Sequence, residues 1–252
     1  MSVRHLKHLK TKKGRDETGL FILEGEKFIA EIPPHYQIDQ YIIANRYANS
    51  HDIAPYQSRA ICHIVKDSIF DSLADTVNPQ GILAICYKQP STMAQIFHNA
   101  PHFILLGENL NDPGNIGTLI RTAAAAGASG VVLTQASADV YNPKVLRATA
   151  GAIFRIPVVT DIVLADVHQQ LSAQGVPIYA AHPRGENTPY ALPLAESFCL
   201  LVGNEAQGIT PQAMALANQL VTIPMVNRTE SLNASVAGCI LLYEAVRQRG
   251  QY

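Results

Sequence analysis

The apolar and polar residues of the chain alternate between short apolar runs and longer amphipathic segments. The apolar runs predict β-strands, and they lie at 20–23, 41–44, 61–65, 82–87, 103–106, 131–133, 177–180, 199–202 and 221–223. Helices are predicted near 68–75, 116–126, 211–218 and 232–247. Strands that alternate with helices are typical of α/β folds. In the last helix an apolar stripe at helical spacing predicts a core-facing surface formed by Leu232, Val236, Ile240 and Tyr243.

A polar segment divides this pattern in two. Residues 88–92, Lys-Gln-Pro-Ser-Thr, follow a predicted strand and have the composition of a linker. We therefore predict two α/β domains, a smaller one over 1–92 and a larger one over 93–252. The chain of 252 residues is long enough for both to bury a hydrophobic core.

The net charge of −1 means that any affinity for nucleic acid depends on where the charges lie. The first 15 residues contain no acidic side chain, and their basic residues are Arg4, Lys7, Lys10, Lys12, Lys13 and Arg15. Such a segment can contact RNA phosphates without reading the base sequence. The alternative interpretation is a solvated tail. We predict RNA binding by these six side chains.

Composition argues against several other classes of protein. No apolar stretch approaches the roughly 20 residues of a membrane span, and the N-terminus has no apolar block typical of a secretory signal. We therefore expect a cytoplasmic protein without a membrane partner. The four cysteines are scattered and no His, Cys and acidic cluster has ligand spacing, so no metal site is predicted. Dinucleotide and P-loop glycine motifs are absent, which disfavours a nucleotide-binding oxidoreductase.

Three polar loops follow predicted strands, at the sheet edge where α/β proteins bind ligands. The first, 107–123, contains the turn sequence Asp-Pro-Gly-Asn and then begins a helix. Asn115 is expected at the helix cap, and Arg121 follows six residues later. Taken alone, this loop is more typical of an ordinary helix cap followed by a surface ion pair.

The other two loops lie in the last quarter of the chain. Loop 202–209 has a glycine near each end, which permits close backbone approach to a ligand. Loop 223–238 leads into the last helix, where Ser231 is the expected N-cap. Asn233 and Ser235 are polar residues in the first turn of a largely apolar helix, and packing alone does not explain them.

Together, in this order, the three loops resemble the motifs of the SpoU/TrmH family of the SPOUT methyltransferase superfamily. The matching segments are Asn-Asp-Pro-Gly-Asn-Ile-Gly-Thr-Leu-Ile-Arg-Thr-Ala at 111–123, Val-Gly-Asn-Glu-Ala-Gln-Gly-Ile at 202–209, and Ile-Pro-Met at 223–225 with Ser-Leu-Asn-Ala-Ser-Val-Ala at 231–237. Arg-Ala-Thr-Ala-Gly-Ala at 147–152 also resembles a subsidiary segment of the family. More weakly, 21–26 and 79–84 resemble its ribosomal-protein-like substrate domain.

This resemblance implies a fold, a cofactor and a set of site residues. The fold is a C-terminal parallel sheet threaded into a trefoil knot, preceded by a smaller ribosomal-protein-like α/β domain. The implied cofactor is S-adenosylmethionine, contacted by Gly203, Ile223 and Leu232. The implied catalytic residues are Asn115, Arg121, Glu205, Ser231 and Asn233. Arg147 is expected to contact RNA, and the C-terminal domain is expected to form a homodimer.

The activity implied by the resemblance is methyl transfer from S-adenosylmethionine to a ribose 2′-hydroxyl of RNA. This reaction is an in-line displacement, so positioning supplies much of the acceleration. No histidine lies in the three motifs to take the hydroxyl proton. Because arginine side chains stay protonated in proteins, we expect Arg121 to hold a phosphate while a phosphate oxygen or water takes the proton.

Large-subunit rRNA is the favoured substrate, because the first domain resembles that of the rRNA-modifying branch of the family. Two alternatives stay open at this stage. One is a methyltransferase that acts on tRNA, and the other is a non-catalytic RNA-binding protein of ribosome assembly.

Overall fold

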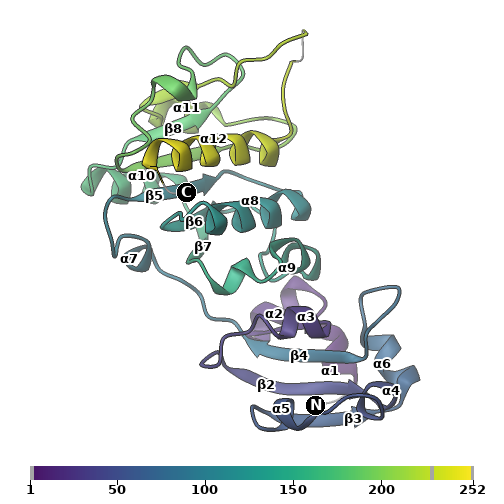
Figure 1. Cartoon of the computed structure of the whole chain (residues 1–252). Helices are drawn as coiled ribbons and strands as arrows, with labels where there is room; N and C mark the ends of the chain where they lie inside the picture. The colour runs from purple at the N-terminus through teal and green to yellow at the C-terminus, as the bar shows by residue number, and fades with distance from the viewer. Residues whose placement is uncertain (1–2, 228–229, 251–252) are drawn as a thin grey trace. The chain divides into compact units, whose positions relative to one another are not determined.

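The computed structural model describes residues 3–227 and 230–250, and its contacts divide the chain into two compact units (Figure 1). The first unit runs to Gln89 and also includes 141–154, and the second unit contains the rest. The predicted division after residue 92 assigned 141–154 to the larger domain, whereas the structure groups this segment with the first unit. The physical reason is that the buried side chain of Leu146 packs among the apolar residues of the first unit.

The first unit is built on a four-stranded sheet in the order β1-β4-β2-β3. Its strands are β1 (Leu20–Glu24), β2 (Ile38–Ala44), β3 (Ile61–Val65) and β4 (Ile82–Tyr87). β2 and β3 are parallel, and β4 runs antiparallel to both β1 and β2. Its helices are α1 (Val3–His8), α2 (Lys12–Thr18), α3 (Glu26–Ile29), α4 (Asn45–Ala48), α5 (Ala54–Gln57), α6 (Asp67–Leu73) and α9 (Pro143–Thr149), with a 3-10 turn at Ala152–Phe154. The four predicted strands and the predicted helix near 68–75 are confirmed.

The basic N-terminal segment is folded. Leu6 and Leu9 are buried in a core that α1 forms with α6 and one face of the sheet. Thr11 caps α2 by accepting a hydrogen bond from Gly14 N at 3.0 Å, and Gly19 ends the helix with a φ of 68°. The alternative interpretation of this segment as a solvated tail is therefore wrong.

The second unit contains a six-stranded sheet in which all neighbouring strands are parallel, in the order β10-β8-β9-β5-β6-β7. The strands are β5 (Phe103–Gly107), β6 (Gly130–Thr134), β7 (Val158–Ile162), β8 (Ile178–Ala181), β9 (Phe198–Val202) and β10 (Gln219–Val221). The helices are α7 (Met93–Ile96), α8 (Pro113–Ala125), α10 (Leu164–Ala173), α11 (Pro211–Leu216) and α12 (Ala234–Arg249), with a 3-10 turn at Pro189–Ala191.

The central strands of this sheet explain the strongest apolar runs of the sequence. Every residue of β5, β6 and β9 is buried, as expected for parallel strands covered on both faces. The structure adds β7 and α10, which the sequence pattern did not predict. β7 is an edge strand and only its first two residues are buried, so its apolar run is too short to stand out. The predicted trefoil knot stays a prediction.

Two helices, α8 and α12, lie against each other beside the sheet (Figure 1). A Cβ at Gly238 would lie 2.5 Å from a terminal methyl group of Leu119, so a larger residue there would displace the Leu119 side chain between the two helices. The face of α12 that carries Gly238, Leu241 and Leu242 is buried. The stripe predicted to face the core instead exposes three large side chains, which are Val236 at 46%, Ile240 at 41% and Tyr243 at 53%.

Candidate active site

A single cavity of about 330 Å³ lies at the carboxyl ends of β8, β9 and β10, where three loops meet. Its walls are formed by the loop after β9, the loop after β10 and the residues that lead into α12. All three residues predicted to contact the cofactor line it, namely Gly203, Ile223 and Leu232, and Glu205 and Ser231 line it as well. The second and third sequence motifs therefore enclose one binding site.

The backbone of the loop after β9 folds back on itself at the cavity wall. Asn204 and Gly208 exchange backbone hydrogen bonds of 3.0 and 2.9 Å. A Cβ at Gly203 would lie 2.4 Å from Gly208 C and 2.4 Å from Ile209 N, so no larger residue fits there without opening the loop. The sequence therefore requires glycine at position 203 for close packing of backbone on backbone.

The loop after β8 also contributes to the cavity, which the sequence analysis missed. His182 and Pro183 line it, and His182 Nδ1 accepts a hydrogen bond from Arg184 N at 3.2 Å. The only available signal was that these residues follow a predicted strand and therefore lie at the ligand-binding edge of the sheet.

Hydrogen bonds join the first motif to the second beside the cavity. Asp112 is the N-cap of α8, because its Oδ1 accepts from Asn115 N at 2.8 Å. Asn115 is therefore not the cap that the sequence predicted but lies buried in the first turn. Its Nδ2 donates to Glu205 Oε1 at 3.0 Å. The Glu205 carboxylate also accepts from the backbone N–H groups of Asn111 and Asp112, at 3.3 and 3.2 Å.

The same set of contacts extends to the third motif. Asn233 is the N-cap of α12, where its Oδ1 accepts from the backbone N–H groups of Ser235 and Val236, whereas Ser231 was the predicted cap. Asparagine suits this position because its short side chain reaches the free N–H groups of the first turn. The hydroxyl of Ser235 donates to Oδ1 of both Asn115 and Asn233. Ser231 lies exposed at the cavity wall.

Glu205 is held in its charged form. Partial burial raises the pKa of its carboxyl, but the hydrogen bonds from Asn115 and from the backbone N–H groups of its own residue, Asn111 and Asp112 outweigh burial, so the pKa lies below its ordinary value of 4.5. A carboxylate with a lowered pKa is a weak proton acceptor at neutral pH. Its chemical contribution is thus to orient Asn115.

Arg121 is the one predicted catalytic residue that the structure keeps apart from the others. It is exposed on α8 and does not line the cavity. Within residues 3–227 and 230–250 it makes no hydrogen bond or ion pair. Six residues of α-helix separate it from Asn115 by about 9 Å along the axis and by roughly 120° around it. The two side chains therefore point in different directions from α8.

The basic side chains of the first unit differ in how freely they can reach RNA. Arg15 is 2% exposed, and its guanidinium donates to the carbonyl oxygens of Leu9 and Lys10 at 3.0 and 2.9 Å. This contradicts the prediction that Arg15 binds RNA, because its charge is used to satisfy carbonyl groups between α1 and α2. Arg4 and Lys7 lie exposed on α1 and form no ion pair within the part of the chain that the structure describes.

The remaining predicted RNA contacts already have partners in the unit. Lys10 donates to the carbonyl of Ala74, and the other exposed pairs are Lys12 with Asp16 and Lys13 with Glu17. Surface pairs of this kind contribute only about 0–1 kcal/mol to folding, so phosphate contacts at these lysines stay predictions.

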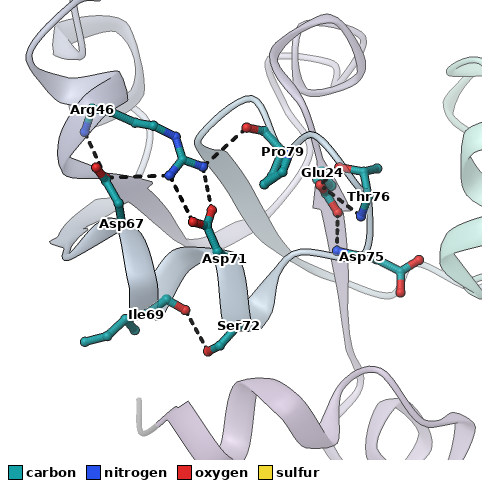
Figure 2. Close-up of polar contacts among 9 residues, drawn as sticks. All are labelled: Glu24, Arg46, Asp67, Ile69, Asp71, Ser72, Asp75, Thr76 and Pro79. Carbon is teal, nitrogen blue, oxygen red and sulfur yellow. Dashed lines mark hydrogen bonds and ion pairs between the residues drawn. The ribbon is translucent and has the colours of Figure 1, made fainter.

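The loop after α6 contacts both β1 and Arg147, the last of the predicted RNA contacts. Glu24 of β1 accepts from the backbone N–H of Asp75 at 2.7 Å, as Figure 2 shows. The Asp75 carboxylate in turn pairs with Arg147 of α9 at 3.0 Å. In α6 itself, the carboxylate of Asp71 forms an ion pair of 2.6 Å with Arg46 of α4 (Figure 2). Arg147 therefore stays a predicted RNA contact whose present partner is Asp75.

The described residues offer neither a metal site nor a helix that spans a membrane. Among residues 3–227 and 230–250, no group of three or more His, Cys, Asp or Glu side chains could hold a metal ion. In the same residues, no helix is both long and apolar enough to cross a membrane.

Comparison with known proteins now identifies the family. The model of the SpoU rRNA Methylase family matches residues 102–243, and that of the MRM3-like substrate binding domain matches residues 1–84. The chain is 33% identical to the 23S rRNA (guanosine(2553)-2′-O)-methyltransferase RlmP of Bacillus subtilis, over 96% of this chain and 94% of that protein. The chain belongs to the SpoU rRNA methylase family.

Solved structures agree with this assignment. The AdoMet-bound rRNA methyltransferase from Sinorhizobium meliloti has a TM-score of 0.86 and 30% identity, over 97% of this chain and 94% of that chain. The SpoU methyltransferase AviRb from Streptomyces viridochromogenes, solved with AdoMet, has a TM-score of 0.91 at 24% identity, over 98% and 97%, and shows the shared fold. The predicted family, α/β fold class and S-adenosylmethionine-dependent methyltransferase activity are confirmed.

Proposed function

We propose that this SpoU methylase transfers a methyl group from S-adenosylmethionine to the ribose 2′-hydroxyl of a guanosine in 23S rRNA. The observation that carries the proposal is the cavity lined by the second and third motif loops, with hydrogen bonds beside it that join both motifs to Asn115 of the first motif. RlmP of Bacillus subtilis and RlmB of Xanthomonas axonopodis are both named as guanosine 2′-O-methyltransferases of 23S rRNA, which supports the choice of nucleotide.

The cavity fits the cofactor. Its volume of about 330 Å³ falls within the range of about 300–1,000 Å³ that is typical of small-molecule sites. Ile209, Ile223 and Leu232 offer an apolar wall, and the backbone around Gly203 offers hydrogen-bonding groups at close range. The bound cofactor supplies an electrophilic methyl group.

The residues beside the cavity would position the RNA ribose for in-line attack. Glu205 orients Asn115, and both sequence neighbours of Asn233, Leu232 and Ala234, line the cavity. Positioning of this kind can supply about 7–11 kcal/mol of the barrier reduction. Because the Glu205 carboxylate is engaged by Asn115 and by two backbone N–H groups, the hydroxyl proton passes to a phosphate oxygen or to water.

A homodimer is the second part of the proposal. The exposed apolar stripe of α12 is formed by Val236, Ile240 and Tyr243, and contiguous apolar surface of this kind marks association sites. The guanidinium of Arg121 on α8 supports the same conclusion, because a charged side chain without a partner among residues 3–227 and 230–250 can serve a site formed across the interface. In the dimer Arg121 would hold a substrate phosphate.

The RNA would also contact the first unit, whose match to a substrate-binding domain supports this role. Arg4 and Lys7 are the two basic side chains best placed for phosphate contacts, because both are exposed on α1 without ion-pair partners in the described residues. A cytoplasmic location is likewise proposed.

The test is methylation of purified 23S rRNA that lacks the native modification, with labelled S-adenosylmethionine and the purified protein. Nucleoside digestion followed by mass spectrometry should show 2′-O-methylguanosine. Methylation of tRNA alone, or of another nucleoside, would contradict the proposed target. Cofactor binding without any methyl transfer would instead support the non-catalytic alternative.

A further inference from the structure

One buried hydroxyl joins the first and third motifs. Ser235 lies in the first turn of α12 and is only 5% exposed. Its Oγ is 2.7 Å from Asn233 Oδ1 and 3.0 Å from Asn115 Oδ1. Asn115 lies 120 positions earlier in the chain, so the Ser235 hydroxyl holds together side chains of two distant loops.

The orientation of both amide groups follows from partners that can only accept or only donate a hydrogen bond. Asn115 Nδ2 points to the Glu205 carboxylate, which only accepts, so Asn115 Oδ1 faces Ser235. Asn233 Oδ1 accepts from two backbone N–H groups, which only donate, so this oxygen also faces Ser235. The single O–H proton of Ser235 is therefore shared between two fixed acceptors.

This arrangement sets the direction of a free donor. With its oxygen held by Ser235 and by the helix N-terminus, the Nδ2 group of Asn233 turns away from α12. That Nδ2 makes no hydrogen bond within the residues that the structure describes, and Asn233 is an exposed residue whose sequence neighbours Leu232 and Ala234 line the cavity. An exposed amide donor at this place can bind an oxygen of the incoming nucleotide.

We propose that Ser235 is a positioning residue for methyl transfer, which holds the Asn115 and Asn233 amides so that Asn233 Nδ2 faces the substrate. The inference rests on the proposed function, because Asn233 must act on the RNA for its orientation to matter. Without the hydroxyl, the buried oxygen of Asn115 has no donor in the described residues, and the direct link between the Asn115 and Asn233 amides is lost.

The test compares Ser235→Ala with Ser235→Thr, which keeps the hydroxyl, and with Ser172→Ala, a matched exposed serine in α10. Removing one hydrogen-bond donor to a buried acceptor should lower kcat about tenfold in Ser235→Ala. The affinity for S-adenosylmethionine should change by less than about twofold, because independent contacts are retained. Ser235→Thr should recover most of the rate, and Ser172→Ala should match the wild type.

A double-mutant cycle separates positioning from a general role in folding. In an Asn233→Ala background, Ser235→Ala should have little further effect on kcat, because the group that it positions is gone. The same loss in both backgrounds would overturn the inference, as would wild-type kcat in Ser235→Ala.

A second readout needs no turnover. The side-chain amide signals of Asn115 and Asn233 in a ¹⁵N spectrum of the full-length protein should shift or broaden in Ser235→Ala and not in Ser172→Ala. Unchanged signals would overturn the inference. If the wild-type protein failed to methylate RNA, the proposed function would fall, while these amide signals would still decide whether Ser235 orients the two side chains.

Discussion

Replacement of Gly203 by alanine should damage the cofactor site through one steric contact. The new Cβ would lie 2.4 Å from both Gly208 C and Ile209 N, whereas ordinary contacts begin near 3.4 Å. The loop after β9 must therefore open by about 1 Å, because both atoms belong to the backbone and cannot rotate away. Opening would break the backbone pairing between Asn204 and Gly208.

Overpacking of this kind costs about 1–3 kcal/mol. If this cost destabilises the closed loop that binds the cofactor relative to the opened loop, the affinity for S-adenosylmethionine should fall by about 5- to 150-fold. Isothermal titration calorimetry of Gly203→Ala measures this directly, with thermal unfolding as a check on the fold.

Gly175→Ala is the matched control. Gly175 has a positive φ of 65°, but a Cβ there would meet nothing within 4 Å, and the residue lies outside the cavity. This variant should lose about 1 kcal/mol of stability through backbone strain. Its cofactor affinity should stay unchanged. If Gly203→Ala bound the cofactor as tightly as the control, the close approach at Gly203 would have no part in the site.

Three further predictions concern RNA binding, association and pH. Arg4→Ala combined with Lys7→Ala should weaken rRNA binding and reduce the slope of log affinity against log salt by up to about 1.8, with cofactor affinity unchanged, and an unaltered slope in a filter-binding series would exclude these phosphate contacts. Tyr243→Glu should place a charge in the exposed stripe of α12 and shift sedimentation toward a monomer with loss of methylation, so an active dimer would contradict the proposed interface. Because the folded-state pKa of Glu205 is lowered, its stabilising hydrogen bonds are fully present above pH 4.5 and are lost as the pH falls through that lower pKa. Below pH 4.5 the thermal unfolding temperature of the wild type should therefore fall more steeply with decreasing pH than that of Glu205→Gln. Equal decreases in the two proteins would refute this role for Glu205.

Several site residues could be predicted from sequence because their motifs are local. Gly203, Ile223 and Leu232 each lie in a loop that follows a predicted strand, and all three line one cavity. Parallel strands end at one edge of a sheet, so loops far apart in sequence are expected to meet there. The cap positions were less predictable, because several Asn, Asp and Ser residues precede each helix and only the backbone decides which one accepts the first hydrogen bond.

Other residues could not be placed from pattern alone. The basic character of the N-terminus predicted RNA contacts, but the structure buries Arg15 against carbonyl groups and leaves Arg4 and Lys7 exposed. Helical spacing identified an apolar stripe in α12 but not the side on which it lies. Gly238 and Leu241 face the protein, because glycine leaves room for the Leu119 side chain of α8.

By itself, the amino-acid sequence determined the alternation of strands and helices, the three motif loops and the family to which they belong. These features depend on the order of neighbouring residues, because that order sets the side-chain periodicity of each element and the residues at each turn. Only the tertiary structure decided that Asn115, Glu205, Ser235 and Asn233 share hydrogen bonds, and that Arg121 stands apart from them. Contacts across 90 or 120 positions depend on the packing of whole helices and strands, which no local pattern specifies.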